Sequence, residues 1–547
     1  MNDDDRKRIN EANLALVADM QPASVFKFFA ELSAIPRGSG NVGKVADFLV
    51  EFAKRKEFGY ERDEVGNVII RKPGKSGEAG KSGESGKSGE AGKSGEAGKS
   101  KEPDEPEEAG KSGESGESET CVGVILQAHQ DMVCVKNADV DHDFTTDPIE
   151  FTTDKKWLRA NGTTLGADDG IGVALALAVL DDSSIPHPPL EALFTVDEET
   201  DMKGAKAVKA SSLRGDTLIN LDAEDLGIAY VSSAAGVGFR MLLPLVREAS
   251  ARAVLRNVTV DGLLGGHSGI EINKARANAY VLLARFLADG CKDINYSLLS
   301  FAQGEGHGAD NAIPDRATAL LSFDSEDEAR KLDRLVTDWS DTFSKKEYRV
   351  TDPGARVRVL PGTAGTNPEA LTTASRDLLL DTVRLLPLGV FRFLQDKRLE
   401  TIKYKDLLVE TSCNLGIVAL EDEQAVLSLL ARGSTESALN DFMSRIGALA
   451  RMAGGGIDVH NRTSGWEMPA EESRVMELFR DQGLDLLGVH AGLECGCLVE
   501  AFVHEKRKLD AISVGPDLKD VHSPKERLRI DTVKELCDQL LAVLAAL

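Results

Sequence analysis

The 547-residue chain has little of what marks secreted, disulfide-built or membrane-spanning proteins. Its seven cysteines are an odd number spread thinly, and their spacing indicates neither a disulfide framework nor a zinc knuckle. No segment reaches the roughly 18 consecutive apolar residues that a membrane helix needs. The first twenty residues are charged and lack the apolar core of a signal peptide. We therefore expect a cytoplasmic protein in a reducing compartment, with no membrane partner.

Basic residues are also in short supply. The chain carries 65 Lys plus Arg against 90 Asp plus Glu, a formal net charge of −25. A surface of that sign repels nucleic acid and anionic membranes, so we expect no nucleic-acid partner. Hydrophobic residues make up 42% of the chain, enough for a sizeable core. The length allows for more than one domain.

One segment, residues 74–119, has no large apolar side chain, and its first half repeats a glycine-, serine- and lysine-rich hexad. It holds 7 Lys against 12 Asp plus Glu. Such a composition cannot bury enough surface to offset the entropy of ordering. We predict a flexible insert between two strands, GNVIIRKP and CVGVILQ, which we expect to be neighbours in one sheet.

The remaining chain divides into three parts. Residues 1–235 alternate strands such as VGVILQAHQDM and LEALFTVDEET with helices such as GIGVALALAVLDD, which predicts an α/β domain with helices packed on a mostly parallel mixed sheet. Residues 236–461 change to separated strands and long helices, typical of an α+β domain. Residues 462–547 return to helix, strand and a final helix. This order indicates one domain inserted within another.

The stretch LQAHQDM places His129 and Asp131 two residues apart at the end of an apolar strand. Alternate side chains of a strand point the same way, so both can lie on one face. A histidine that simply hydrogen-bonds a nearby carboxylate is the plain alternative. On its own the pair decides nothing.

Acidic residues follow the next apolar segments, and we expect them at the carboxyl ends of strands, where sites form in open α/β sheets. Carboxylates gathered there repel one another unless a cation holds them. Together with His129 they would offer the nitrogen and oxygen ligands of zinc or a similar ion. A solvated acidic rim explains any one group, but less easily all three in succession. The groups are Asp168 with Asp169, Asp197 with Glu198 and Glu199, and Asp222 with Glu224 and Asp225.

Longer blocks in the chain carry a family resemblance. NGTTLGADDGIGVALALAV, TVDEETDMKGA, GGHSGIEINKARANA, HAGLECG and SVGPDLKDVHSP follow one another in order. In these blocks the chain closely resembles the aminoacyl-histidine dipeptidases, among the dinuclear zinc peptidases that include carboxypeptidase G and the aminoacylases. The resemblance implies a cytoplasmic, homodimeric enzyme that cleaves small dipeptides with a free N-terminus. It also implies that residues 236–461 form a lid and dimerisation domain within the catalytic domain, and it leaves the 74–119 insert out.

The same resemblance implies a site with two divalent ions per subunit, zinc first, with cobalt or manganese as alternatives. Asp168 would bridge the ions, and Asp131 would orient His129 from behind. Glu198 would be the general base. The five implied metal ligands are His129, Asp168, Glu199, Asp222 and His522.

Further residues would handle the substrate. The family implies that His267, in GGHSG, donates to the oxyanion from the lid of a partner subunit; a mere tight turn is the alternative. Asn311 and Arg432 would bind the dipeptide backbone and carboxylate, since Arg presents a planar fork, and Glu494 the free ammonium.

The other histidines are expected to be structural or exposed. Among them His490, beside GLECG, is the one most open to a role at the site. Cys495 is expected to be a small buried thiol. The others are His142, His187, His307, His460 and His504. Two alternatives remain open: an N-acyl amino acid deacylase or carboxypeptidase with the same metals, and a non-catalytic binding protein.

Overall fold

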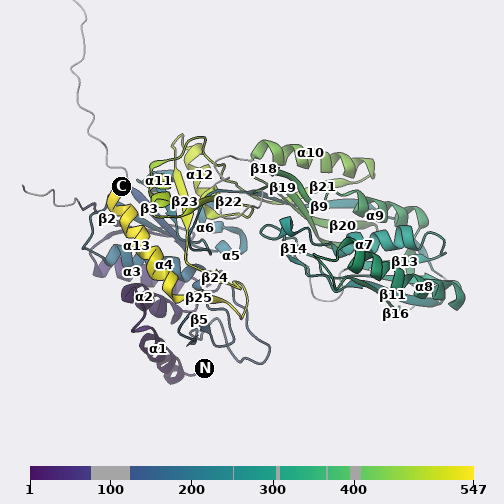
Figure 1. The fold of residues 1–547 in the computed structure, drawn as a ribbon, viewed down its shortest axis with the longest axis horizontal. Helices are drawn as coiled ribbons and strands as arrows, with labels where there is room; N and C mark the ends of the chain where they lie inside the picture. The colour runs from purple at the N-terminus through teal and green to yellow at the C-terminus, as the bar shows by residue number, and fades with distance from the viewer. Residues whose placement is uncertain (76–122, 251, 303–307, 365–367, 395–407) are drawn as a thin grey trace, which may run out of the picture.

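The computed structural model describes residues 1–75, 123–250, 252–302, 308–364, 368–394 and 408–547. Almost all of the 74–119 insert, and also His307, lie outside these described residues. The chain forms two lobes side by side, the first built from both ends of the sequence and the second from its middle (Figure 1).

An eight-stranded sheet forms the centre of the first lobe. Four neighbouring pairs are parallel (β6 with β3, β3 with β7, β7 with β23, β8 with β22) and three are antiparallel. This confirms the predicted mixed, mostly parallel sheet. Across the sheet the strands are β1 (Gly59–Arg62), β2 (Val68–Lys72), β6 (Leu190–Thr195), β3 (Val124–His129), β7 (Thr217–Asn220), β23 (Asp510–Val514), β8 (Ile228–Ser233) and β22 (Asp485–Val489).

Strand β3 shows how the sheet aims its side chains. All six of its residues are buried, as expected for a central strand covered on both faces. Leu126 packs in the larger core with the helices α2 to α4 and α13, whereas Ile125 packs in a smaller core with α12. Residues of odd number therefore face α12, and His129 at the strand end belongs to that set. The helices of this lobe are α1 (Asp3–Val17), α2 (Ala23–Ser33), α3 (Gly43–Arg55), α4 (Ala167–Asp181), α5 (Glu198–Asp201), α6 (Lys203–Ala207), α11 (Arg474–Asp481), α12 (Glu494–His504) and α13 (Ile530–Ala546).

The strands that flank the insert lie in one sheet, but they are not neighbours as predicted. Strand β6 lies between β2 and β3, antiparallel to the first and parallel to the second. The alternating pattern of a strand gives its buried faces but not its partner, which is decided by distant segments. A smaller antiparallel sheet flanks the lobe, in the order β24 (Leu518–Lys519), β25 (Arg527–Arg529), β5 (Trp157–Ala160) and β4 (Phe151–Thr153).

The second lobe contains the same topology twice. One unit runs strand, helix, strand, strand, helix, strand, and its strands pair in the order second, third, first, fourth. The other unit repeats that order, with one extra edge strand, β18 (Gly389–Leu394). The inner unit consists of β11 (Val254–Asp261), α7 (Ala279–Arg285), β13 (Ser297–Ala302), β15 (Ala317–Phe323), α8 (Glu326–Asp341) and β16 (Arg356–Pro361). The outer unit consists of β9 (Ala235–Pro244), α9 (Thr373–Leu385), β19 (Leu408–Leu420), β20 (Gln424–Gly433), α10 (Glu436–Met452) and β21 (Gly456–Thr463).

The inner unit is inserted into the outer one. Strand β10 (Arg247–Ala249), just after β9, pairs with β17 (Glu369–Leu371), just before α9, and closes the stem of that insertion. One continuous apolar core runs through both units. The proposed domain boundaries at 235/236 and 461/462 stay predictions.

Within the described residues, no helix is both long enough and apolar enough to span a membrane.

Candidate metal centre and active site

Three of the predicted ligands come from adjacent parallel strands. His129 ends β3, Glu199 lies in the short helix α5 that follows β6, and Asp222 follows β7 by two residues. Because β6, β3 and β7 are parallel neighbours, their carboxyl ends meet at one edge of the sheet. The other two ligands arrive separately: Asp168 from the start of α4, and His522 from the β24–β25 turn. The expectation that Asp168 ends a strand is therefore wrong.

Asp168 lies between the two histidines. Its Oδ1 is 3.1 Å from His129 Nε2, and its Oδ2 is 3.1 Å from His522 Nε2. Asp222 Oδ1 lies 3.6 Å from the same nitrogen of His129, while Glu199 Oε2 lies 2.9 Å from that of His522. The five side chains thus form two half-sites that share Asp168.

The charges of this cluster call for a cation. Hydrogen bonds to Asp168 and Glu199 raise the pKa of His522 to about 11. Burial opposes protonation of His129, yet Asp222 and the other carboxylates around it raise its pKa well above the usual value. Burial raises the pKa of Asp222 to about 6. A cluster that draws protons onto both histidines is one in which positive charge is missing.

The donor set fits divalent ions. Donor atoms converge within 4.8 Å in three overlapping groups: His129 with Asp168 and Asp222, His129 with Glu198 and Glu199, and Asp168 with Glu199 and His522. Glu199 Oε1 is buried and has no hydrogen-bond partner among the described residues. Imidazole nitrogens mixed with carboxylate oxygens suit zinc, cobalt and manganese.

Asp131 is fully buried behind His129, with Oδ1 3.4 Å from the Nδ1 of that ring. Its carboxylate also accepts hydrogen bonds from the Ser39 hydroxyl at 2.7 Å and from the backbone N–H groups of Glu198 and Glu199 at 3.1 and 3.3 Å. Asp131 therefore connects the His129 ring to the segment that carries both glutamates. Ser39 was not singled out from the sequence.

Two acidic residues of the predicted groups have other roles. Asp169 is buried and accepts hydrogen bonds from the backbone N–H groups of His129 at 3.2 Å and Gly172 at 3.1 Å. Its role is therefore to fix the backbone at the end of β3 and in the first turns of α4. Glu198 is half-buried as the first residue of α5, and burial raises its pKa well above the usual value. A carboxylate that accepts protons readily is what a general base requires.

His267 stands in β12 (Gly266–His267), which pairs with β14 (Ala312–Ile313) in the inner unit of the second lobe. Its Nδ1 accepts the backbone N–H groups of Gly269 and Ile270, both at 3.2 Å. The proton of the neutral ring is therefore on Nε2, which is the donor atom of this ring. Burial and the nearby charges of Arg432 and His522 lower the pKa of His267 to about 4.

Arg432, near the end of β20 in the outer unit, meets the same loop. A Cβ at Gly269 would lie 3.0 Å from His267 Cε1, 3.3 Å from Arg432 Nε and 2.7 Å from the His490 carbonyl oxygen. Arg432 is 8% exposed, and its Nε is buried without a hydrogen-bond partner among the described residues. Burial lowers its pKa to about 10. A buried guanidinium nitrogen without a hydrogen-bond partner is able to bind an anionic ligand.

His490, four residues before Glu494, is buried against the outer unit of the second lobe. Its Nε2 lies 2.8 Å from the Ser412 hydroxyl, and its Nδ1 is buried without a partner among the described residues. Burial, with the Arg432 charge, lowers the pKa of His490 to about 3. It is a neutral, buried group at the base of the His267 loop, and not an exposed one.

Glu494 begins α12 and is fully buried. Its Oε2 accepts hydrogen bonds from Gln127 Nε2 at 2.5 Å and the Thr195 hydroxyl at 2.7 Å, while Oε1 has no partner among the described residues. Burial raises its pKa to about 7. Cys495 beside it is buried, as expected of a structural thiol.

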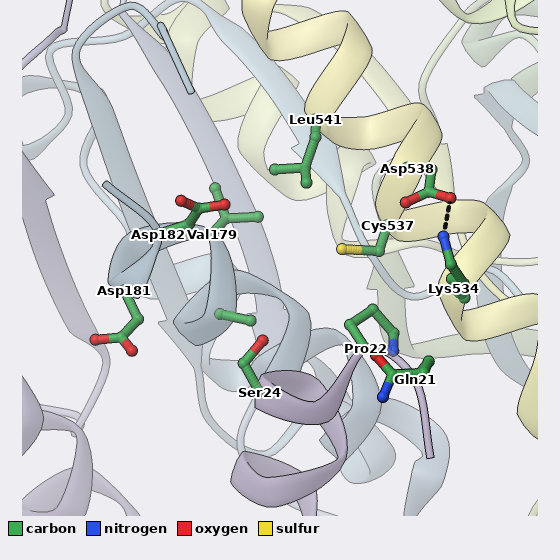
Figure 2. A pocket seen from close by; sticks show the side chains of 11 residues that line it. Gln21, Pro22, Ser24, Val179, Asp181, Asp182, Lys534, Cys537, Asp538 and Leu541 are labelled. Atoms are coloured by element: carbon green, nitrogen blue, oxygen red, sulfur yellow. Dashed lines mark hydrogen bonds and ion pairs between the residues drawn. The ribbon is translucent and has the colours of Figure 1, made fainter. Parts of the chain in front are cut away.

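Asn311 is exposed, and its carbonyl oxygen accepts the Ser268 N–H at 2.8 Å, which places it next to the His267 loop. A separate cavity of about 410 Å³ lies between α2, α4 and α13 (Figure 2). None of the predicted site residues lines it, so the chemistry is located by the convergent donors and not by that hollow.

Comparison with known proteins agrees with this architecture. The model of peptidase family M20/M25/M40 matches residues 125–546. The chain is 33% identical over 525 residues to the cytosol non-specific dipeptidase of Escherichia coli (strain K12), covering 94% of this chain and 96% of that protein. It also superposes on the crystal structure of aminoacylhistidine dipeptidase from Vibrio alginolyticus with a TM-score of 0.73 and 32% identity, covering 97% of this chain and 98% of that one. Aminopeptidase PepT from Bacillus cereus, 12% identical with a TM-score of 0.50 over 96% and 98% of the two chains, shares the fold.

The fold and the site thus define a metallopeptidase. The chain belongs to peptidase family M20/M25/M40.

Proposed function

We propose that the protein is a dipeptidase that uses two divalent metal ions, zinc first, to hydrolyse dipeptides with a free N-terminus, Xaa-His among them. The observation that carries this proposal is Asp168, whose two oxygens each face a different histidine at 3.1 Å. The Escherichia coli and Vibrio relatives are named as dipeptidases, and the first of these names supports a cytosolic location.

In this proposal His129, Asp168 and Asp222 would hold one ion, and Asp168, Glu199 and His522 would hold the other. When bound, such ions polarise the scissile carbonyl and lower the pKa of water. Glu198 takes the proton of the attacking water and passes it to the leaving amine. His267 Nε2–H donates to the developing oxyanion, a role that the two N–H groups on its Nδ1 support.

The two ends of a dipeptide find complementary groups. Arg432, whose Nε is buried without a partner among the described residues, would bind the carboxylate, with Asn311 beside the same loop contacting the backbone. Glu494 Oε1, buried and without a partner among the described residues, would receive the free ammonium. A site that binds both termini limits the substrate to two residues.

His267 acts within its own chain in this proposal. It comes from the inner unit of the second lobe and Arg432 from the outer unit, yet both lie against Gly269 of the same chain. This arrangement supports a proposal in which the inner unit supplies from within the chain what the family resemblance assigned to a partner subunit. The homodimer stays a prediction, and each site would be complete without it.

The related deacylase and carboxypeptidase functions share the metal ligands and differ in the substrate amine. A deacylase accepts an acylated nitrogen, whereas Glu494 would demand a free ammonium. A binding protein without catalysis would be expected to lack a ligand or the base, and here His129, Asp168, Glu198, Glu199, Asp222 and His522 are all present.

The test compares a panel of dipeptides with their N-acetylated forms, using protein freed of metal and then reloaded with Zn²⁺, Co²⁺ or Mn²⁺. We expect hydrolysis of the free dipeptides only, and only after reloading. Preferential cleavage of the acetylated forms would establish the deacylase instead. Cleavage of neither class would refute a peptidase of small substrates.

A further inference from the structure

Glu526 is a buried carboxylate that takes no part in the proposed catalysis. It is 2% exposed and lies just before β25, four residues after His522 on the same turn. Both of its oxygens point at the loop that leads into α4. Oε2 accepts the backbone N–H groups of Leu165 and Gly166 at 2.7 and 3.0 Å. Oε1 accepts those of Ala167 and Asp168 at 2.8 and 3.3 Å.

Four consecutive N–H groups around one carboxylate form an anion nest at the start of a helix. The last of the four belongs to Asp168, so the carboxylate fixes the backbone from which that side chain reaches both histidines. Without the acceptor these N–H groups would be buried and unpaired, and the loop would have to move to recover partners.

A second buried charged residue, Arg37, binds the same loop through a backbone carbonyl oxygen. Arg37 is 1% exposed and donates to the carbonyl oxygens of Gln130 at 3.1 Å, Asp131 at 2.7 Å and Gly166. It therefore connects the end of β3 with the loop before α4. A Cβ at Gly170 would overlap Arg37 Nη2, which explains a glycine at this position in the helix.

We propose that Glu526 is a positioning residue of the metal centre. It orients Asp168 through the four N–H groups that it accepts. Because it also lies on the same turn as His522, it connects Asp168, which both half-sites share, with His522, which belongs to one of them. This inference rests on the proposed two-metal function. Removing the acceptor is expected to weaken both half-sites, including the His129 half-site that Glu526 never touches.

The test is Co²⁺ binding by the full chain, freed of metal and titrated against a competing chelator, with the Co²⁺ absorption spectrum as readout. Glu526→Gln keeps the size but turns an N–H₂ group toward donors. We expect its Co²⁺ affinity to fall about 10- to 100-fold at both half-sites, with an altered spectrum. Glu526→Asp, which keeps the charge on a shorter stem, should lose less.

Glu191 provides the matched control. It is 4% exposed near the opposite end of β6 and accepts the N–H groups of Arg214 at 2.7 Å and Gly215 at 2.9 Å. Glu191→Gln should lower thermal stability and leave Co²⁺ affinity and spectrum unchanged. If Glu526→Gln does not fold, Glu526→Asp decides by the same readout.

Wild-type Co²⁺ affinity in folded Glu526→Gln would overturn this inference alone, and so would an equal loss in Glu191→Gln. If Glu526→Gln does not fold, wild-type affinity in Glu526→Asp would overturn it. Failure of the unaltered protein to bind two ions would instead refute the proposed function.

Discussion

Asp168 shares its two carboxylate oxygens between His129 and His522, and a second carboxylate lies close to each of those rings. No single residue of this set identifies a metal centre, because each has an ordinary structural explanation. Their arrangement around one shared carboxylate is what distinguishes two half-sites from an acidic rim. The roles of the adjacent residues Glu198 and Glu199, general base and metal ligand in our proposal, are distinguished by substitution.

Glu199 faces His522 at 2.9 Å, whereas Glu198 is the base in our proposal. Glu198→Gln keeps size and hydrogen bonding but cannot take a proton. We expect it to bind two ions and dipeptide normally while kcat falls about 10²- to 10⁴-fold. Glu199→Gln should lose affinity for one ion and recover partly in excess metal. Metal analysis beside steady-state kinetics measures both; metal lost from the first variant and retained in the second would reverse the assignment.

Glu494→Gln removes the charge proposed for the substrate ammonium and leaves an oxygen for Gln127 and Thr195. A hydrogen bond to a charged group contributes about 1.5–3 kcal/mol, so KM for free dipeptides should rise about 10- to 100-fold. Metal content should not change. An unchanged KM would remove Glu494 from the substrate site, and a loss of metal would give it a different role.

Strand β3 is the element whose role could be read from sequence. Its apolar run predicted a buried strand, and the alternation of side chains along a strand allowed His129 and Asp131 to lie on one face. Both residues are buried, and His129 Nδ1 lies 3.4 Å from Asp131 Oδ1. The gathering of Glu199 and Asp222 followed from the parallel order of the strands. These inferences depend on local pattern and on one general rule of open sheets.

Other contacts could not be predicted, because they join segments hundreds of residues apart. Glu526 caps a loop some 360 positions away, and Gln127 meets Glu494 across 367. The predicted strand order was wrong for the same reason: β6, a distant segment, lies between β2 and β3. The sequence holds a weak sign of Glu526, its place four residues after His522, but nothing that reveals what it accepts.

The insert between β2 and β3 lies outside the described residues except for its first two positions. The described residues on either side of the gap at 76–122 both lie against Pro189. Ideal Cβ atoms at Gly74 and Gly123 would lie 3.0 Å from Pro189 Cδ and 3.4 Å from the Pro189 carbonyl oxygen. A short Gly/Ser turn in place of residues 76–122 can therefore close the chain.

We expect that shortened protein to keep its thermal midpoint and its kcat/KM on small dipeptides, since loop closure costs only about 0.6 kcal/mol per doubling of length. Thermal unfolding and steady-state kinetics of the two proteins measure this. Loss of folding or of activity would show that the insert packs on the body of the protein.

At the scale of the whole molecule, the second lobe places two copies of one topology in a single chain. His267 comes from one copy and Arg432 from the other, and in our proposal both serve the site of their own chain. This arrangement allows a direct test by subunit mixing.

His267→Ala should lower kcat about 10²- to 10³-fold, as removal of an oxyanion donor does. Mixing it with Glu198→Gln should restore nothing, because within one chain every site keeps one defect. Activity of mixed samples, with assembly followed by light scattering, measures this. Recovery in mixed dimers would place His267 in the partner's site and contradict our proposal.

The central claim, a dipeptidase whose two metal ions share Asp168, is tested most directly by adding Zn²⁺ to metal-free protein and measuring bound metal and dipeptide hydrolysis on the same sample. We predict no hydrolysis without metal, full hydrolysis at two ions per chain, and loss of tight binding at both half-sites in Asp168→Asn, a larger loss than in Asp222→Asn. Full activity of metal-free protein, or Asp168→Asn that binds two ions as tightly as the unaltered chain, would contradict the claim.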